Sequence, residues 1–110
     1  MCYNVSMVFG LWWDEQDLDH IRHRSTRYPG ATDIEPTETQ EAAADPDRIV
    51  REPDPKSHRN YIRLIGYSPS AGAVLTVIAR PSDHGGVTAW TTTGADLRTY
   101  RQRSARRQTP

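Results

Sequence analysis

The second half of the chain alternates apolar and polar side chains with a period of two, and this pattern restricts the fold more than any other feature. Four segments carry it, at 48–51, 60–67, 73–80 and 87–92. A period of two places successive side chains on opposite faces of a strand. The last three segments are separated by short stretches rich in Pro, Gly and Ser, which favour turns between antiparallel neighbours. We therefore predict an antiparallel sheet of about four strands, with the most apolar segment, 73–80, in a central position.

Two helices are predicted ahead of this sheet. The acidic stretch 14–17 suits the first turn of a helix, where negative charge faces the positive end of the helix dipole. Leu18 and Ile21 would form its buried stripe, and Tyr28-Pro29-Gly30 would end it. A second helix is expected to start at Glu35-Pro36, because Pro is favoured at the first helical position, and to stop before Asp45. The aromatic segment 9–13 predicts a short edge strand or a packing arm.

The C-terminal segment predicts a third, basic helix. Thr93 and Asp96 have the spacing of a capping box, and Leu97 and Tyr100 would form the inward pair. The outer positions carry arginine at Arg98, Arg101, Arg103, Arg106 and Arg107. Residues 103–110 are expected to fray as a basic tail. The predicted fold class is therefore α+β, an antiparallel sheet with two N-terminal helices and one basic C-terminal helix packed on it.

Length and composition predict one domain without a membrane anchor. A chain of 110 residues is too short for two separate cores, and we expect 1–10 to form a flexible arm. The longest apolar stretch, Ala71–Ala79, is far shorter than the ~20 residues of a membrane span, and the N-terminus lacks the pattern of a signal peptide. Cys2 is the sole cysteine, so no internal disulfide is expected. These features predict a cytoplasmic protein.

Charge is divided unevenly between the two halves of the chain. Residues 1–55 contain twelve acidic side chains and five arginines, a net charge of −7, whereas residues 56–110 contain nine basic and two acidic side chains, a net charge of +7. One interpretation is that the basic half contacts nucleic acid or an acidic partner. The other is that the two halves neutralise each other within the fold. The sequence alone favours neither.

Several local strings, in their order along the chain, resemble the BrnT family, the toxin components of bacterial toxin–antitoxin pairs. The resemblance covers about residues 11–102 and rests on order and spacing. Its four pieces are Trp12-Trp13-Asp14, the acidic helix between Ile34-Glu35-Pro36 and Asp45-Pro46, the strand Tyr61-Ile62-Arg63-Leu64-Ile65-Gly66-Tyr67-Ser68, and Val87-Thr88-Ala89-Trp90 followed by Asp96-Leu97-Arg98-Thr99-Tyr100. It implies a RelE-like fold, ribonuclease activity without a metal or other cofactor, and a complex with a small DNA-binding antitoxin. One departure matters: family members usually carry basic residues at the end of the last strand, where this chain has Thr91-Thr92-Thr93.

RNA cleavage of this kind turns a 2′-OH into a nucleophile against the adjacent phosphate. It requires a proton acceptor, a proton donor and cations for the charge of the transition state. The candidate catalytic residues are His20 and His23, which titrate near neutral pH, and Arg63. The candidate RNA-binding residues are Lys56, Arg59, Tyr61, Tyr67 and Arg80. Strand alternation places Tyr61, Arg63 and Tyr67 on one face. Arg98 and Arg101 are the candidate partner-binding residues.

Each candidate also has an ordinary structural interpretation. His20 and His23 have the spacing of a solvated pair on a helix, and they lack a third ligand for a metal. The cluster Lys56-Ser57-His58-Arg59 has the composition of a polar turn. Tyr61 and Tyr67 suit half-buried sheet positions, and Trp90 is predicted in the core.

Three functions follow from these candidates. The first is a metal-independent ribonuclease toxin inhibited by an antitoxin, with DNA contacted only through that partner. The second is a module that retains the antitoxin-binding surface but no longer cuts, suggested by Thr91-Thr92-Thr93. The third is direct DNA binding by the arginines of 98–107, which matches no standard DNA-reading motif.

Overall fold

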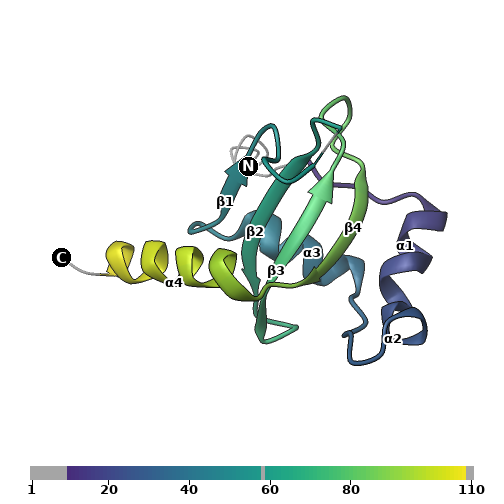
Figure 1. The fold of residues 1–110 in the computed structure, drawn as a ribbon, viewed down its shortest axis with the longest axis horizontal. Coiled ribbons are helices and arrows are strands. Elements are labelled where there is room, and N and C mark those ends of the chain that lie inside the picture. The colour runs from purple at the N-terminus through teal and green to yellow at the C-terminus, as the bar shows by residue number, and fades with distance from the viewer. Residues whose placement is uncertain (1–9, 58, 109–110) are drawn as a thin grey trace, which may run out of the picture.

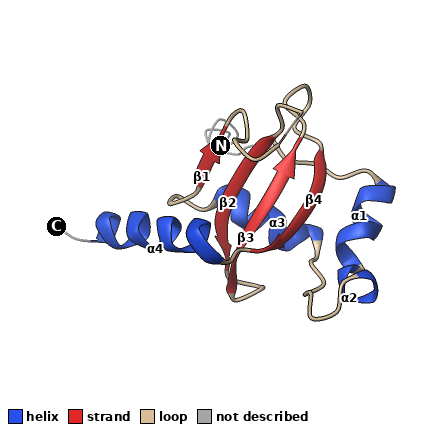
Figure 2. Cartoon of the chain, viewed as in Figure 1, coloured by secondary structure: helices blue, strands red, loops and turns tan. Residues whose placement is uncertain are grey.

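The computed structural model describes residues 10–57 and 59–108 and confirms the predicted α+β class (Figures 1 and 2). The strands form one antiparallel sheet in the order β1-β2-β3-β4. Their bounds are β1 (Ile49–Arg51), β2 (Ile62–Ser68), β3 (Ala73–Ala79) and β4 (Gly86–Thr91). The helices of the described residues are α1 (Glu15–Arg22), α2 (Arg24–Arg27), α3 (Pro36–Ala44) and α4 (Gly94–Gln108). The flexible arm predicted at 1–10 lies, but for Gly10, outside the described residues.

The first helix is interrupted at His23, where a single helix was predicted to run on to Tyr28. Asp14 caps α1 by accepting a hydrogen bond from the backbone N–H of Asp17 at 2.9 Å. The Ile21 carbonyl, which would accept the next bond of the helix ladder, instead accepts the N–H of Ile34 at 2.9 Å. The Ser25 N–H is taken by the Asp33 carboxylate at 2.8 Å. Residues brought back by the chain reversal after α2 therefore replace the helical partners.

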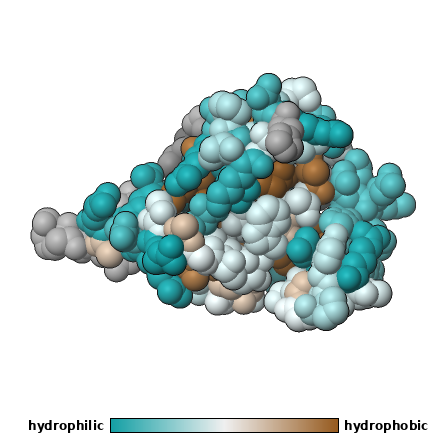
Figure 3. Space-filling view, in the orientation of Figure 1, coloured by the Kyte–Doolittle hydropathy of each residue, from teal (hydrophilic) through white to brown (hydrophobic). Residues whose placement is uncertain are grey.

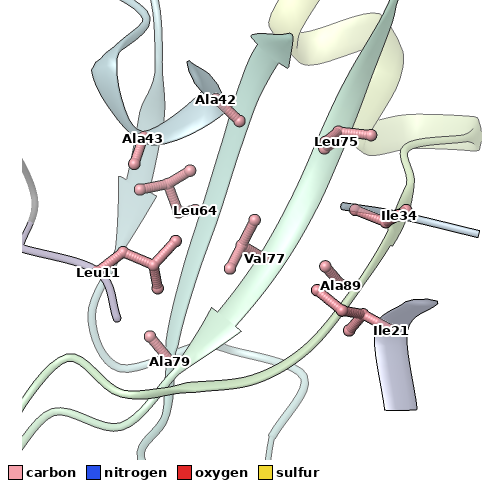
Figure 4. Packing of buried hydrophobic residues seen from close by; sticks show 10 residues of the cluster. All are labelled: Leu11, Ile21, Ile34, Ala42, Ala43, Leu64, Leu75, Val77, Ala79 and Ala89. Carbon is pink, nitrogen blue, oxygen red and sulfur yellow. The ribbon is translucent and has the colours of Figure 1, made fainter. Parts of the chain in front are cut away.

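One face of the sheet packs on α1 and α3 to form the core (Figure 4). Leu64, Val77 and Ala89 lie side by side across β2, β3 and β4, because antiparallel pairing sets them in register. The helical segments contribute Ile21, Ala42 and Ala43, all fully buried, and the loop before α3 contributes Ile34. This cluster holds ten of the fourteen buried hydrophobic residues of the described chain.

The alanines of α3 have a packing role that their composition did not predict. A β-carbon added to Gly66 of β2 would lie 2.1 Å from the Ala42 carbonyl oxygen. Backbone therefore approaches backbone between strand and helix, which requires glycine on one side and favours small residues on the other. As predicted, α3 begins at Pro36, and a capping box of Glu35 and Glu38 closes its start.

The segment before α1 forms a packing arm along β4, one of the two alternatives predicted for it. Leu11 is buried, and Trp12 forms an isolated parallel bridge with Gly85. The Trp13 ring lies on Gly86, and its indole N–H donates to Thr39 Oγ1 at 2.9 Å. The arm thus fastens the start of β4 to α3.

The α4 helix crosses one end of the opposite face of the sheet and then extends away from the sheet (Figure 1). Tyr100 is buried and donates its hydroxyl hydrogen to Asp45, while Leu97 is half-buried. The frayed tail predicted from 103 is instead helical as far as Gln108, and Arg103 Nε donates to the Asp47 carbonyl at 3.1 Å. Within the described ranges, no helix has the length and apolar character to cross a membrane.

Candidate functional site

A cavity of about 360 Å³ lies on the face of the sheet opposite α3, which we call the open face. Ile78 and Val87 supply its apolar surface, and Thr88 and Trp90 of β4 line it from one side. The loop before β2 brings polar residues to the other side, where Arg63 of β2 joins them. The loop residues are Asp54, Lys56, Ser57, Arg59 and Tyr61. We call this hollow the Tyr61 cavity. Figure 3 shows apolar surface in the middle of this face, next to strongly hydrophilic residues.

Asp54 folds the loop that carries the cationic side of the cavity. Its carboxylate accepts the N–H of Lys56 at 3.0 Å, and its carbonyl accepts the N–H of Ser57 at 3.2 Å, an arrangement typical of Asp in a turn. The Asp54 N–H donates to the Tyr61 carbonyl at 2.6 Å and closes the loop. Lys56, Arg59 and Tyr61 are therefore held at the start of β2. His58 of the predicted cluster lies outside the described residues.

Arg63 is buried between two carboxylates. Its Nε and one terminal nitrogen donate to the two oxygens of Asp54 at 2.8 and 3.2 Å, and the other terminal nitrogen donates to Asp96 at 3.2 Å. The guanidinium carbon lies 5.4 Å from the centre of the Trp90 ring. Burial raises the pKa of Asp54, but the hydrogen bonds from Arg63 and the Lys56 amide outweigh it, so the net pKa lies below its usual value. Arg63 therefore links β2, the loop and α4, while its catalytic role stays a prediction.

Three other cations near Trp90 are more available to an anion. Lys56 has a side chain 60% exposed, and its Nζ lies 3.9 Å from Asp96. Arg59 is exposed, and Arg24 donates to Thr88 Oγ1 at 3.4 Å while lying over the Tyr28 ring. Within the described part of the chain, neither Arg24 nor Arg59 forms an ion pair.

A second hollow of about 380 Å³ adjoins the first and shares Trp90 with it. It is lined by Arg24, Gly30, Ala31, Thr32, Trp90, Thr91 and Thr93. Arg24 from α2 thus reaches the end of β4, where the sequence has threonines in place of basic residues. Thr92 itself is buried and bonds to Thr76 at 2.8 Å, which assigns it to the sheet interior rather than to a ligand.

The two predicted catalytic histidines lie beside Arg24. Burial lowers the pKa of His20, and the charges of Arg27 and Arg24 lower it further, so the imidazole is neutral and able to accept a proton at pH 7. Its Nδ1 contacts the Arg27 guanidinium. His23 is exposed at the helix break, with its Nδ1 3.2 Å from Asp19 Oδ1. The contact between Arg24 and Thr88 connects this group to the Tyr61 cavity.

The remaining predicted site residues lie elsewhere. Tyr67 of β2 has the same phase of alternation as Tyr61, which precedes the strand, but it lies six residues further along the chain, about 20 Å away at 3.3 Å per residue. It is 41% exposed, in a hollow that also contains Arg101. Arg80 lies 3.2 Å from Asp83 and 3.8 Å from Asp17, over the Trp12 ring. Arg98 and Arg101 are exposed on α4, as a partner-binding role requires.

Four residues of the open face were not among the predicted site residues: Arg24, Asp54, Trp90 and Asp96. The prediction that Trp90 is a core residue is wrong, since it is half-buried and lines both hollows. A signal existed in the sequence. Trp90 alternates in phase with Thr88 and Thr92 rather than with Ala89, so it faces away from the core.

No protein-family model matches the chain, and neither the curated proteins nor the solved structures contain a match. In the described part of the chain, no group of three His, Cys, Asp or Glu side chains could hold a metal ion.

Proposed function

We propose that this chain is a metal-independent endoribonuclease of the toxin–antitoxin type, acting in the cytoplasm and inhibited by a cognate antitoxin protein. The observation that carries the proposal is the open face, where an aromatic-lined cavity is flanked by Lys56, Arg59 and Arg24. Cations beside partly exposed aromatic rings suit single-stranded RNA, because the cations can bind its phosphates and the rings can stack on its bases. The resemblance to the BrnT family supports the reaction class.

In the proposed reaction, His20 accepts the proton of a 2′-OH. The 2′-oxygen attacks the adjacent phosphorus, the bond from phosphorus to the 5′-oxygen breaks, and the leaving oxygen takes a proton from His23. The products are a 2′,3′-cyclic phosphate and a 5′-OH end. Arg24 and Arg27, whose charges lower the pKa of His20, would stabilise the negative charge of the transition state. Arg24 would thereby serve where basic residues are missing from the end of β4.

A second function, a binding module that does not cut RNA, is favoured by the contacts of Arg63. Asp54 and Asp96 occupy its hydrogen-bonding nitrogens, so a phosphate would have to displace a buried carboxylate to reach it. In this case the chain would bind its antitoxin, with Arg98 and Arg101 contacting acidic side chains, and would reach DNA only through that partner.

Growth and cleavage assays on the chain expressed without a partner distinguish the two functions. If the enzyme proposal holds, the native chain arrests growth and cuts RNA, and His20→Ala lowers the cleavage rate by about 10²- to 10⁴-fold. The rate should rise with pH through a value below 6.5, because the base has a lowered pKa. Gln16→Ala, one turn earlier and exposed, is the control. A soluble chain that neither arrests growth nor cuts RNA, yet forms a stable complex with its antitoxin, would support the binding module.

A further inference from the structure

We propose that the Tyr61 cavity holds one unpaired base of a single-stranded RNA, stacked against the Tyr61 ring, with the neighbouring phosphates on Lys56 and Arg59. This inference deepens the proposed function and rests on it for the choice of RNA as ligand. It adds a position at which the strand is held and a preference for unpaired over paired RNA.

The surface of the cavity matches the faces of a base. Ile78 and Val87 supply apolar surface, and Tyr61 is half-buried, so its ring is partly open to a ligand. A volume of about 360 Å³ is at the low end of small-molecule sites, which suits one nucleotide unit better than a longer segment. Aromatic rings bind bases by stacking, and every base has a face that can stack.

The charges around the cavity match the backbone on either side of that base. Lys56 and Arg59 project from the loop, while the Asp54 carboxylate is bound by Arg63 and by the Lys56 amide. Arg63 thus neutralises the acidic group that would otherwise repel a phosphate. An apolar pocket with cations at its edge is the complement of a base with its phosphates.

Duplex RNA does not fit this arrangement. Its bases are stacked and paired, so neither face is available to Tyr61, and recognition of RNA sequence generally targets unstacked bases. The cavity should therefore favour single strands, loops and bulges over a duplex of the same sequence. This preference separates the inference from attraction to phosphate alone, which duplex RNA would satisfy equally well.

The first test measures binding of a fluorescently labelled, fully 2′-O-methylated RNA decamer by anisotropy. The methyl groups block the 2′-oxygen, so binding is measured without cleavage. Tyr61→Ala should weaken binding by about five- to a hundredfold, the usual contribution of one stacked base. Tyr61→Phe, which keeps the ring, should bind as the native chain does. Tyr67→Ala is the matched control, because Tyr67 is the same residue type in the same phase of alternation as Tyr61 but lies near the other end of β2, outside the cavity.

The second test joins the protein change to a change in the RNA. Each decamer of a set lacks the base at one position. For the native chain, one of these decamers should bind much more weakly than the intact decamer. Tyr61→Ala should bind that decamer almost as well as it binds the intact one, because the stacking contact is already lost.

Three results would each overturn the inference. The affinity losses from Tyr61→Ala and from the missing base could be additive, the duplex could bind as tightly as the single strand, or Tyr67→Ala could weaken binding as much as Tyr61→Ala. An absence of RNA binding, or a loss on Tyr61→Ala confined to an acidic protein partner, would overturn it as well.

These outcomes are separable from the fate of the enzyme proposal. If the affinity losses with the methylated RNA are coupled but ordinary RNA is not cleaved, the base pocket is supported and the ribonuclease proposal is wrong. Cleavage of ordinary RNA with no coupling at Tyr61 would retain the ribonuclease and reject the pocket.

Discussion

At the scale of single residues, the structure of the open face depends on the hydrogen bonds that Arg63 donates. A guanidinium has donors that match the two oxygens of a carboxylate, and Arg63 applies them to Asp54 and, with its remaining nitrogen, to Asp96. The residue is 7% exposed, so these contacts exclude most water. A buried ion pair adds little net stability when whole, but removal of one member leaves an uncompensated charge. Arg63 should therefore matter most for keeping the loop and α4 in place.

Arg63→Ala should lower the free energy of unfolding by about 3–5 kcal/mol at pH 7, because two buried carboxylates lose their cation. The pKa of Asp54 is lowered in the folded chain, so its contribution is present above its ordinary value of 3.8 and is lost as pH falls below that value. The difference between native chain and variant should therefore shrink towards pH 3. Chemical denaturation at both pH values measures it.

Arg98→Ala, an exposed change on α4, is the control and should stay within about 0.5 kcal/mol of the native chain. A cost below about 1 kcal/mol for Arg63→Ala would mean that the two carboxylates find other partners or water. In that case Arg63 would be free to serve the phosphate, as the sequence first suggested.

At the scale of elements, α4 is unusual in having few apolar anchors. It is a fifteen-residue helix whose outer positions are polar or charged, and Tyr100 is its buried hydrophobic residue. The Tyr100 hydroxyl donates to Asp45, whose carboxylate also accepts the N–H groups of Tyr67 and Asp47. Asp45 follows the last residue of α3, so one carboxylate joins α3, β2 and α4. The position of α4 thus rests on a few polar contacts.

Tyr100→Phe should cost about 1.5–3 kcal/mol at pH 7, as expected for a lost hydrogen bond to a charged group. Burial, followed by the contact with Asp45, raises the pKa of Tyr100 well above its usual value of 10. A raised pKa contributes stability that is present below pH 10 and lost as pH rises, since only the unfolded chain then releases the proton. Stability of the native chain should therefore fall more steeply above pH 10 than that of the variant.

Thermal or chemical unfolding between pH 7 and pH 11 measures both effects. Tyr28→Phe provides the control, because Tyr28 is half exposed and outside this network. If the stability of the native chain and that of Tyr100→Phe fall equally above pH 10, the pKa of Tyr100 is not raised in the folded chain.

At the scale of the whole molecule, the structure bears on the two interpretations that the sequence left open for the opposed charges of the two halves. Asp54 with Arg63 and Asp17 with Arg80 are pairs between the acidic and the basic half, so part of the asymmetry is neutralised within the fold. Other basic side chains stay exposed, among them Lys56 and Arg59 on the open face and Arg98 and Arg101 on α4. The two sets approach each other where Lys56 Nζ lies 3.9 Å from Asp96, in the first turn of α4.

If the proposed RNA is held by Lys56, Arg59 and Arg24 and does not extend along α4, two similar changes should differ in their effect on RNA binding. If Lys56, Arg59 and Arg24 each neutralise one phosphate, log affinity should fall with log salt with a slope of about −2, at about −0.7 per phosphate for single strands. Lys56→Gln should reduce the slope by about 0.7, whereas Arg98→Gln should leave it unchanged. A salt titration of decamer binding gives both slopes, and an equal effect of the two changes would mean that RNA extends along α4.

The sequence by itself determined the strands, the start of α3 and the class of the fold, because a period of two, turn-forming residues and a Pro at the first helical position act on neighbouring residues. It also grouped Lys56, Arg59 and Arg63 and put Tyr61 on the face of Arg63, and all four line the Tyr61 cavity, while their roles stay predictions. These are local properties, which need no knowledge of the rest of the chain.

Only the tertiary structure decided the break at His23, the hydrogen-bond partners of Arg63 and the presence of Arg24 at the site. The Ile21 carbonyl meets Ile34 thirteen residues later, and Arg63 meets Asp96 thirty-three residues later. Tyr67 was predicted on the same face as Arg63, but it lies too far along β2 to reach the Tyr61 cavity. The alternation of a strand gives the face of a side chain and not its distance from the site. Contacts of this kind depend on how the elements pack, and packing is set by the whole core at once rather than by the residues beside each partner.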